Sequence, residues 1–348
     1  MLQELFSLLS GREPPSSRKN NKVPLNKINV PGSSNAEFLR YFEKQLKPLV
    51  DGFEEHRQIQ LSEYFKRRTK VKIGLISFAL IAIVVWTSSL QPYFNFLLII
   101  MIGAFGISSS WARRPIREFQ GGIKHTIFPK LVKYFGDEFE FLSRPNWPLK
   151  NLQAFSILPN YDDDKSEDQI DGVYKGVSFR LMETHLTCDS SDSNARHDRD
   201  TVFKGMLLLF TFNKPFAGKT LVKEDRGVLS RWFKGSSKGM ERVLLEDPIF
   251  EKQFDVYSTD QIESRYLLTP SFMERLLLLS SVLGGKGVTC SFYNNQILMM
   301  VSSSKNRFEA GSIFEQVTFE YETAEFFKEL TQIFSVIETL KLNDKTHL

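Results

Sequence analysis

The feature that most constrains this chain is a run of forty residues, Ile73–Ala112, that contains no Asp, Glu, Lys, Arg or His. A helix needs about 20 predominantly apolar residues to cross the ~30 Å hydrocarbon core of a bilayer. The run is long enough for two such helices, at residues 73–90 and 93–111, and Pro92 predicts a tight turn between them because it lacks a backbone N–H. The alternative, a buried hairpin of a soluble protein, would need forty residues without a charged face. The sequence therefore predicts a transmembrane helical hairpin.

Charges on either side of the hairpin predict its orientation. Five cations lie just before the first span, in Lys66–Lys72, and three lie just after the second, in Trp111–Arg117. Because cationic flanks remain on the cytoplasmic side, we expect both termini in the cytoplasm and a location in the cell (inner) membrane. Residues 1–11 have no basic segment and only a short apolar run, so they do not resemble a cleaved signal. The lipid bilayer is the first expected partner.

Charge also divides the chain into two parts. Residues 1–136 hold 20 Lys and Arg against 9 Asp and Glu, which gives +11. Residues 137–348 hold 25 against 32, which gives −7, and the two values sum to the net charge of +4. A chain of this length is expected to form about two domains.

The basic part contains more than the hairpin. Residues 1–36 are rich in Pro, Ser and Asn, a composition that cannot bury a core and predicts a flexible tail. On both sides of the hairpin, apolar residues recur at helical spacing, so residues 37–136 are expected to form a membrane-proximal helical stalk with the transmembrane hairpin. Pro48 and Pro129 are expected to kink or interrupt the stalk helices.

The acidic part has a different pattern. Short alternating strands and three helical segments predict a soluble, cytoplasmic antiparallel α+β domain at residues 137–348. A capped helix is expected at residues 269–284, a hairpin turn at Asn294–Asn295 and an amphipathic helix at residues 322–342. The predicted fold class is α+β: a transmembrane helical hairpin with a helical stalk, followed by this domain.

Three strings carry a further signal: FLRYFEKQLKPLVDGFEEHR before the hairpin, TVFKGMLLLFTFNKPFAGKT after it, and FDVYSTDQIESRYLLTPSFMERLLLL at Phe254–Leu279. Their order resembles an uncharacterised group of bacterial membrane proteins, the family catalogued as domain of unknown function 3137. The resemblance covers about residues 37–341. It implies two transmembrane helices and one soluble domain, and it implies no activity because none is established for the family. Residues 1–36 and Val222–Gly239 look particular to this sequence.

The segment STDQIESRYLLTP concentrates polar side chains between an expected strand and a capped helix, among them Asp260, Glu263 and Arg265. Two carboxylates and a guanidinium suit ligand binding or acid–base work, which makes these three the candidate catalytic residues. Arg and carboxylates also pair bidentately, so the same residues suit a buried structural network at the helix start. The sequence leaves both interpretations open.

A second candidate is a basic aromatic loop. Residues 214–242 hold eight cations and three acids. Cations interleaved with aromatic rings are typical of contacts with membranes or nucleic acid, and the nearby membrane favours anionic lipid or a protein partner over nucleic acid. The alternative is a solvated loop. The candidate binding residues are Arg231, Trp232, Phe233 and Lys234.

No motif predicts a metal or a cofactor. Five histidines and two cysteines, Cys188 and Cys290, are scattered without the paired spacing of metal ligands. The segment YDDDKSEDQIDG alternates oxygen ligands, but Glu167 stands where an EF-hand requires glycine, so a solvated acidic loop is expected instead. Neither a phosphate-binding loop nor a G-x-S-x-G serine motif occurs.

The sequence therefore favours a membrane-anchored cytoplasmic binding or scaffold domain without evident catalysis. The alternative is an enzyme, for example a hydrolase, that acts at the inner leaflet with its site around Asp260, Glu263 and Arg265. Pocket geometry discriminates between the two, because an enzyme gathers such groups around one concave cleft.

Overall fold

The computed structural model describes residues 35–87, 93–189, 199–212, 215–224, 239–282, 287–303, 308, 313–314 and 320–343. The chain divides into two compact units. Of the described residues, the helical unit holds those within Arg40–Ile127 and Glu309–Glu322, and the sheet unit holds those from residue 35 to Leu39, within Phe128–Phe308 and from Thr323 onward.

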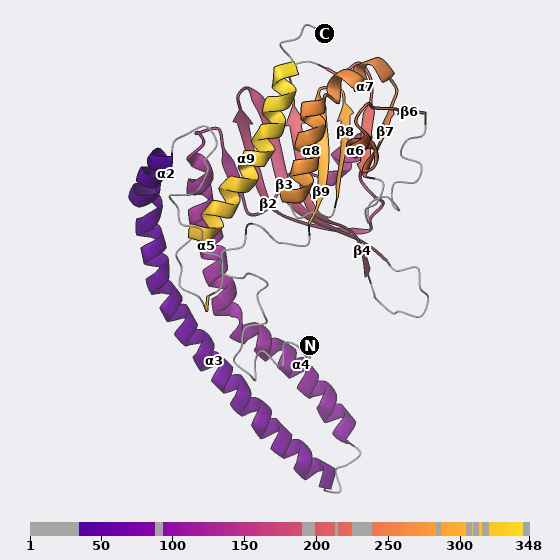
Figure 1. The fold of residues 1–348 in the computed structure, drawn as a ribbon. Coiled ribbons are helices and arrows are strands. Elements are labelled where there is room, and N and C mark those ends of the chain that lie inside the picture. The colour runs from indigo at the N-terminus through magenta and orange to yellow at the C-terminus, as the bar shows by residue number, and fades with distance from the viewer. Residues whose placement is uncertain are drawn as a thin grey trace. The chain divides into compact units, whose positions relative to one another are not determined.

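Long helices dominate the first part of the chain (Figure 1). The π-helical turn η2 ends two residues before Pro48, and its wider turn relieves the clash that a proline ring makes with the carbonyl four residues earlier. Helix α5 continues through Pro129, so this proline does not interrupt the helix, and the alternative expectation of a kink stays a prediction. The elements are α2 (Asn35–Tyr41), η2 (Phe42–Leu46), α3 (Lys47–Thr87), α4 (Phe94–Ala112) and α5 (Arg114–Lys133).

Helices α3 and α4 pack side by side within the helical unit (Figure 1). Val71 of α3 and Phe105 and Ala112 of α4 form a small buried cluster, with Leu75 packed against it. Both helices are long and apolar enough to cross a membrane. The turn predicted between the spans falls on residues 88–92, which lie outside the described residues.

The described strands of the sheet unit form one antiparallel sheet of nine strands, in the order β1-β2-β3-β4-β9-β8-β5-β7-β6. This confirms the predicted α+β class. The strands are β1 (Glu140–Leu142), β2 (Asp163–Tyr174), β3 (Val177–Asp189), β4 (Arg199–Thr211), β5 (Thr220–Glu224), β6 (Glu241–Val243), β7 (Phe254–Ser258), β8 (Val288–Tyr293) and β9 (Gln296–Ser302). The helical elements beside them are η4 (Leu149–Phe155), α6 (Pro248–Glu251), α7 (Gln261–Leu267), α8 (Pro270–Val282) and α9 (Glu320–Asn343).

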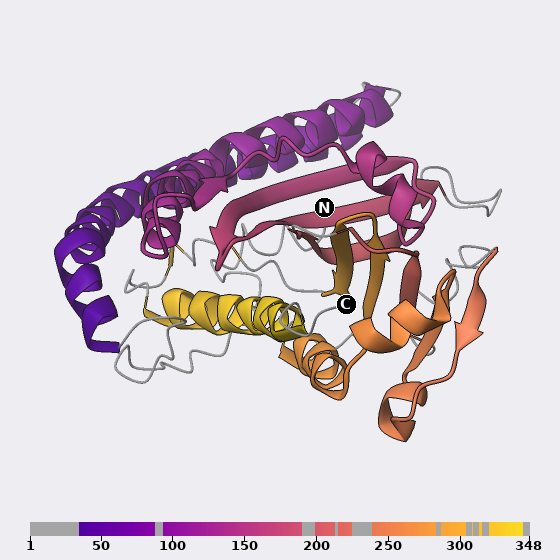
Figure 2. The ribbon, with the colours of Figure 1, turned by 90° about the horizontal axis from the view of Figure 1, so that it is seen from above.

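Helices α8 and α9 cover one face of the sheet (Figure 2). The rings of Phe272 in α8 and Phe292 in β8 lie 5.6 Å apart, centroid to centroid. Phe334 of α9 stacks on Tyr174 of β2 at 4.0 Å. Aromatic pairs of this kind contribute beyond the apolar area that they bury, so they fix both helices to the sheet.

The short helix η4 covers the opposite face. Its residues Leu149, Leu152 and Phe155 share one buried cluster with Leu298 and Met300 of β9. Because successive side chains of a strand point to opposite faces, Met299, which lies between Leu298 and Met300, belongs to the face that α8 and α9 cover. The sheet is therefore the middle layer of three.

Two hairpin turns follow from local chemistry. Asn294 has φ 58° between β8 and β9, which confirms the predicted turn, since asparagine tolerates this conformation. Lys175 and Gly176 both have positive φ between β2 and β3. The acidic segment predicted as a loop is wrong: from Asp163 onward it is strand β2, because pairing along β3 outweighs the low strand propensity of aspartate.

Candidate functional site

The hairpin helices present an apolar surface. Large apolar side chains of both helices are exposed, from Phe96 at 63% to Ile107 at 75% on α4. Soluble proteins rarely expose contiguous apolar surface of this extent, whereas a bilayer would bury it. Within the uncharged run, the exposed set on α3 is Ile73, Ile76, Leu80, Ile81, Ile83, Val84 and Trp86, and on α4 it is Phe96, Ile99, Ile100, Ile102, Ile107 and Trp111.

A basic collar borders this surface; we use the name for the cations of Lys66–Lys72 and Trp111–Arg117. The guanidinium of Arg67 lies 5.0 Å from the centre of the Trp111 ring, and its Nη1 donates to the Trp111 carbonyl at 3.3 Å. Arg117 Nη2 donates to the carbonyl of Ser110 at 3.1 Å. Cations and tryptophan at span ends are typical of the membrane interface.

The predicted catalytic segment forms α7 and its approach. Asp260 is the residue before the helix, and its Oδ1 accepts hydrogen bonds of 2.9 Å from the backbone N–H groups of Ile262 and Glu263. Asp260 therefore caps α7 and satisfies two of the N–H groups that a helix start leaves without partners.

Glu263 binds backbone as well. Its Oε1 accepts from the N–H of Ala217 at 2.6 Å and its Oε2 accepts from the N–H of Gly218 at 2.7 Å. A Cβ at Gly218 would lie 2.8 Å from the Cβ of Asp260, so only glycine fits this close approach. The two carboxylates thus hold the start of α7 against the turn before β5.

Arg265 stands apart from both carboxylates. Its side chain is exposed and makes no hydrogen bond or ion pair with any residue that the structure describes. Asp260 and Glu263 accept hydrogen bonds from backbone N–H groups and none from Arg265 among the described residues, so the Arg–carboxylate network that the sequence allowed is wrong. The candidacy of the three as catalytic residues stays a prediction.

The basic aromatic loop lies outside the described residues. Arg231, Trp232, Phe233 and Lys234 fall between β5, which ends at Glu224, and β6. Their role as binding residues stays a prediction.

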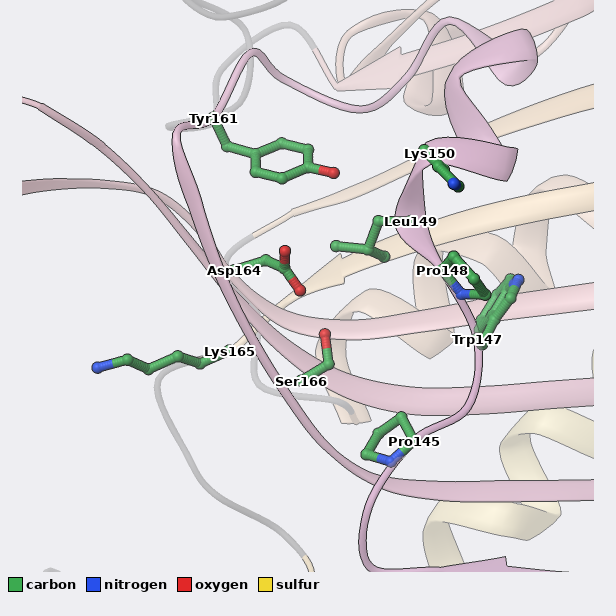
Figure 3. A pocket seen from close by; sticks show the side chains of 9 residues that line it. All are labelled: Pro145, Trp147, Pro148, Leu149, Lys150, Tyr161, Asp164, Lys165 and Ser166. Atoms are coloured by element: carbon green, nitrogen blue, oxygen red, sulfur yellow. The ribbon is translucent and has the colours of Figure 1, made fainter.

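A cavity of about 570 Å³ lies beside the sheet in the sheet unit (Figure 3). One wall comes from the chain between β1 and η4, and the other comes from β2 and the residues before it. Sequence reasoning missed this site. Its lining residues are Pro145, Trp147, Pro148, Leu149 and Lys150 on the first wall, and Tyr161, Asp164, Lys165 and Ser166 on the second.

The β2 wall is rich in oxygen atoms. Asp164 and Ser166 point into the cavity, whereas the intervening Lys165 points away from it (Figure 3). The Ser166 hydroxyl lies 2.9 Å from the hydroxyl of Thr184 on β3. Burial raises the pKa of Tyr161 above its ordinary value, and the carboxylate of Asp164 raises that pKa further. One carboxylate, a phenol and a hydroxyl therefore face an apolar wall.

Polar contacts behind the first wall hold it in place. The ring centre of Trp147 lies 5.6 Å from the guanidinium of Arg180, which binds Asp171 through two hydrogen bonds of 2.9 Å. Gln169 Nε2 donates to both Asp171 oxygens at 2.9 Å and to Asn146 Oδ1 at 3.0 Å. A wall fixed in this way supports a preformed cavity.

A carboxylate cluster lies further along β2. One oxygen each of Glu167, Asp168 and Glu183 lies within 4.8 Å of the other two, and the side chains of Asp168 and Glu183 are buried. A bulge between Glu167 and Ile170, with Asp168 at φ 54°, brings them together. Hard divalent cations prefer such oxygen ligands, although the sequence predicted no metal.

Neither cysteine is activated as a nucleophile. Burial raises the pKa of the Cys290 thiol far above its ordinary value. Burial also raises the pKa of Cys188, and the carboxylate of Asp162 raises it further. The Sγ of Cys188 donates to the Asn160 carbonyl at 3.0 Å. Since the thiolate is the nucleophile, both raised pKa values oppose thiol chemistry.

A comparison with family models finds one match, in the second half of the chain. Residues 201–342, from β4 into α9, match the family described as "Protein of unknown function (DUF3137)". This range contains two of the three strings that carry the resemblance, but not the string before the hairpin.

Other comparisons add little. No curated protein matches the chain. The crystal structure of the mycobacterial trehalose monomycolate transport factor A is similar with a TM-score of 0.31 and 10% identity, over 58% of this chain and 91% of that chain. Over residues 201–342, the chain is therefore similar to the family of unknown function DUF3137.

Proposed function

We propose that this chain is a membrane-anchored binding or scaffold protein of the inner membrane, with two spans and a cytoplasmic sheet unit that binds a protein partner. The observation that carries the proposal is the exposed apolar surface of α3 and α4, bordered by the basic collar. Burial of that surface in lipid is favourable by about 25 cal/mol for each Å² removed from water. The lipid bilayer would therefore be one binding partner of the chain, through α3 and α4.

Charge supports the proposed orientation. The collar consists of five cations just before the uncharged part of α3 and three cations around the end of α4. The forty residues between these two groups carry no charge. Such flanks stay on the cytoplasmic side of a membrane. Both termini would then lie in the cytoplasm.

Binding is better supported than catalysis. Asp260 and Glu263 already accept backbone hydrogen bonds, so they are poor general bases. The cavity joins Asp164, Tyr161 and Ser166 with an apolar wall, which suits recognition of a ligand. An enzyme acting at Asp260, Glu263 and Arg265 is supported less well, because these side chains do not form one interacting set among the described residues.

The basic aromatic loop adds a second proposed contact, which rests on the sequence. Each cation near an anionic leaflet contributes about 1 kcal/mol of attraction, and Trp232 and Phe233 would enter the interface. Binding to anionic vesicles at low salt that falls on Trp232→Ala with Phe233→Ala would support this contact. No vesicle binding by residues 137–348 would remove it.

Alkaline carbonate extraction tests the anchor. The full chain should stay in the membrane pellet, and a control chain without residues 73–112 should be released. Release of the full chain would overturn the proposal. Crosslinking in cells, followed by isolation in mild detergent, should then enrich a polypeptide that is lost when residues 137–348 are deleted.

A further inference from the structure

Strand β2 has an open edge beside the cavity. Along Asp163–Glu167 it pairs with β3 on one side, whereas β1 pairs only with Gln169–Asp171 on the other. No described strand occupies the outer edge of Asp163–Glu167. Since backbone groups in an antiparallel ladder point alternately to both sides, this edge offers N–H and C=O groups to a further strand.

The chain that leaves β1 cannot close this edge itself. After β1 it makes one more backbone contact, from the N–H of Asp168 to the carbonyl of Ser143 at 3.5 Å, and then passes through Pro145 and Pro148. Proline has no N–H to donate to a ladder, so this segment forms the far wall of the cavity and does not pair with β2. The space between the wall and the open edge is the cavity.

Three charged side chains at the cavity form no hydrogen bond or ion pair within the part of the chain that the structure describes. Asp164 points into it with its carboxylate, Lys165 points to the other side of β2, and Lys150 lies on the opposite wall (Figure 3). None of the three makes a hydrogen bond or ion pair with another described residue. An anionic group facing an apolar and aromatic wall matches a long side chain with an apolar stem and a cationic end.

We propose that an extended peptide segment of a partner protein adds to the open edge of β2 and places one arginine or lysine side chain in the cavity against Asp164. This inference rests on the proposed binding function and specifies the chemical nature of the partner segment that the sheet unit would bind. Backbone hydrogen bonds supply affinity in strand addition, and the pocket for an alternate side chain supplies specificity.

The charges also set the pattern of the peptide. Cross-strand neighbours of opposite charge stabilise a pair, and like charges destabilise it. The residue opposite Asp164 is basic, and the residue opposite Lys165, which lies on the other face, is acidic. In an antiparallel pairing, the peptide therefore carries an acidic residue directly before its basic one, and the residue after the basic one, opposite Asp163, is not acidic. A uniformly basic segment is disfavoured because of Lys165.

The full chain in detergent micelles tests the proposal through fluorescence anisotropy of a labelled peptide. The probe is a capped peptide of seven residues with one central arginine, one glutamate directly before it, and threonine and valine elsewhere. We expect saturable binding that weakens about tenfold, or 1.4 kcal/mol, when citrulline replaces arginine or when the chain carries Asp164→Asn. Methylation of alternate peptide nitrogens should abolish binding.

Two further chain variants sharpen the test. Glu140→Gln is the matched control, because it removes an exposed carboxylate of β1 that makes no hydrogen bond with a described residue. It should leave binding unchanged. Lys165→Glu should reverse the preference, so that a peptide with lysine directly before the arginine binds better than the peptide with glutamate there.

Three results would overturn the peptide site. They are equal binding of the arginine and citrulline peptides, unaltered binding by an Asp164→Asn chain, and no saturation up to about 1 mM peptide. Free arginine amide that binds as tightly as the peptide would exclude strand addition. Carbonate extraction of membranes from the same cells, before detergent is added, separates the outcomes, since a chain that stays in the membrane without binding peptide leaves the anchor intact.

Discussion

The carboxylate of Glu263 accepts a hydrogen bond of 2.7 Å from the backbone N–H of Gly218, 45 residues earlier in the chain. A second bond, from the N–H of Ala217, makes the contact bidentate. Helix α7 is thereby tied to the turn that enters β5. The carboxylates of Asp260 and Glu263 in the candidate catalytic segment therefore hold helix α7 in position.

Truncation of Glu263 and of Arg265 should change the stability of the fold by different amounts. Glu263→Ala should lower the free energy of unfolding by roughly 2 kcal/mol, because two backbone donors lose a charged acceptor. Arg265→Ala should change it by no more than about 0.5 kcal/mol, because the side chain is exposed. Thermal melting of both variants compares them directly. Greater loss from Arg265→Ala would contradict the geometry.

Gly218 should not tolerate a side chain. A Cβ there would lie 2.8 Å from the Cβ of Asp260 and 2.9 Å from Oγ1 of Thr259. Gly218→Ala should therefore cost about 1–3 kcal/mol of stability. Gly52→Ala is the control, because nothing lies within 4 Å of its Cβ position in α3 and alanine favours helix by up to about 1 kcal/mol. Similar melting of the two variants would refute this packing.

Acid should weaken the contact of α9 with the β2–β3 turn. The ammonium of Lys175 donates to Glu338 at 2.6 Å and holds the pKa of that carboxyl below its ordinary value of 4.5, and Tyr174 donates at 2.7 Å. A depressed folded pKa means stability that is present above pH ~4.5 and lost as the pH falls through the folded pKa.

The pair is partly exposed, so its contribution is about 0.5 kcal/mol. Denaturant unfolding at pH 7 and pH 3.5 should show a smaller acid loss for Lys175→Met than for the unmodified chain. The same acid loss in both would mean that the pair does not set the pKa of Glu338.

The two thiols should differ in accessibility. Cys290 is fully buried in β8, whereas Cys188 is partly exposed near the end of β3. A maleimide should label Cys188 slowly, because burial and Asp162 raise its pKa, and should label Cys290 only on unfolding. Mass spectrometry of native Cys188→Ser should find no label. Rapid native labelling of Cys290 would contradict its burial.

Features with a local cause could be predicted from the sequence. The missing charges predict the hairpin helices, Asn294 predicts the turn between β8 and β9, and the apolar stripe predicts α9. Each of these depends on residues that are close in the chain. Residues 201–342 likewise carry enough of the family pattern to be matched.

Features that depend on contacts between residues distant in the sequence could not be predicted. The acidic segment from Asp163 onward reads as a loop, because its strand conformation comes from pairing with β3. The cavity joins walls from either side of η4, and the cluster of Glu167, Asp168 and Glu183 depends on a bulge. The partner of Glu263 was missed because a backbone N–H leaves no residue-type signal.

Reporter fusions test the central claim, membrane anchoring by a hairpin with both termini in the cytoplasm, most directly. A reporter that is active only in the periplasm should be inactive after residue 136 and after Leu348, and active when inserted at Gln91 in the predicted turn. A reporter that is active only in the cytoplasm should give the reverse pattern. Periplasmic activity after both residue 136 and Leu348 would contradict the account.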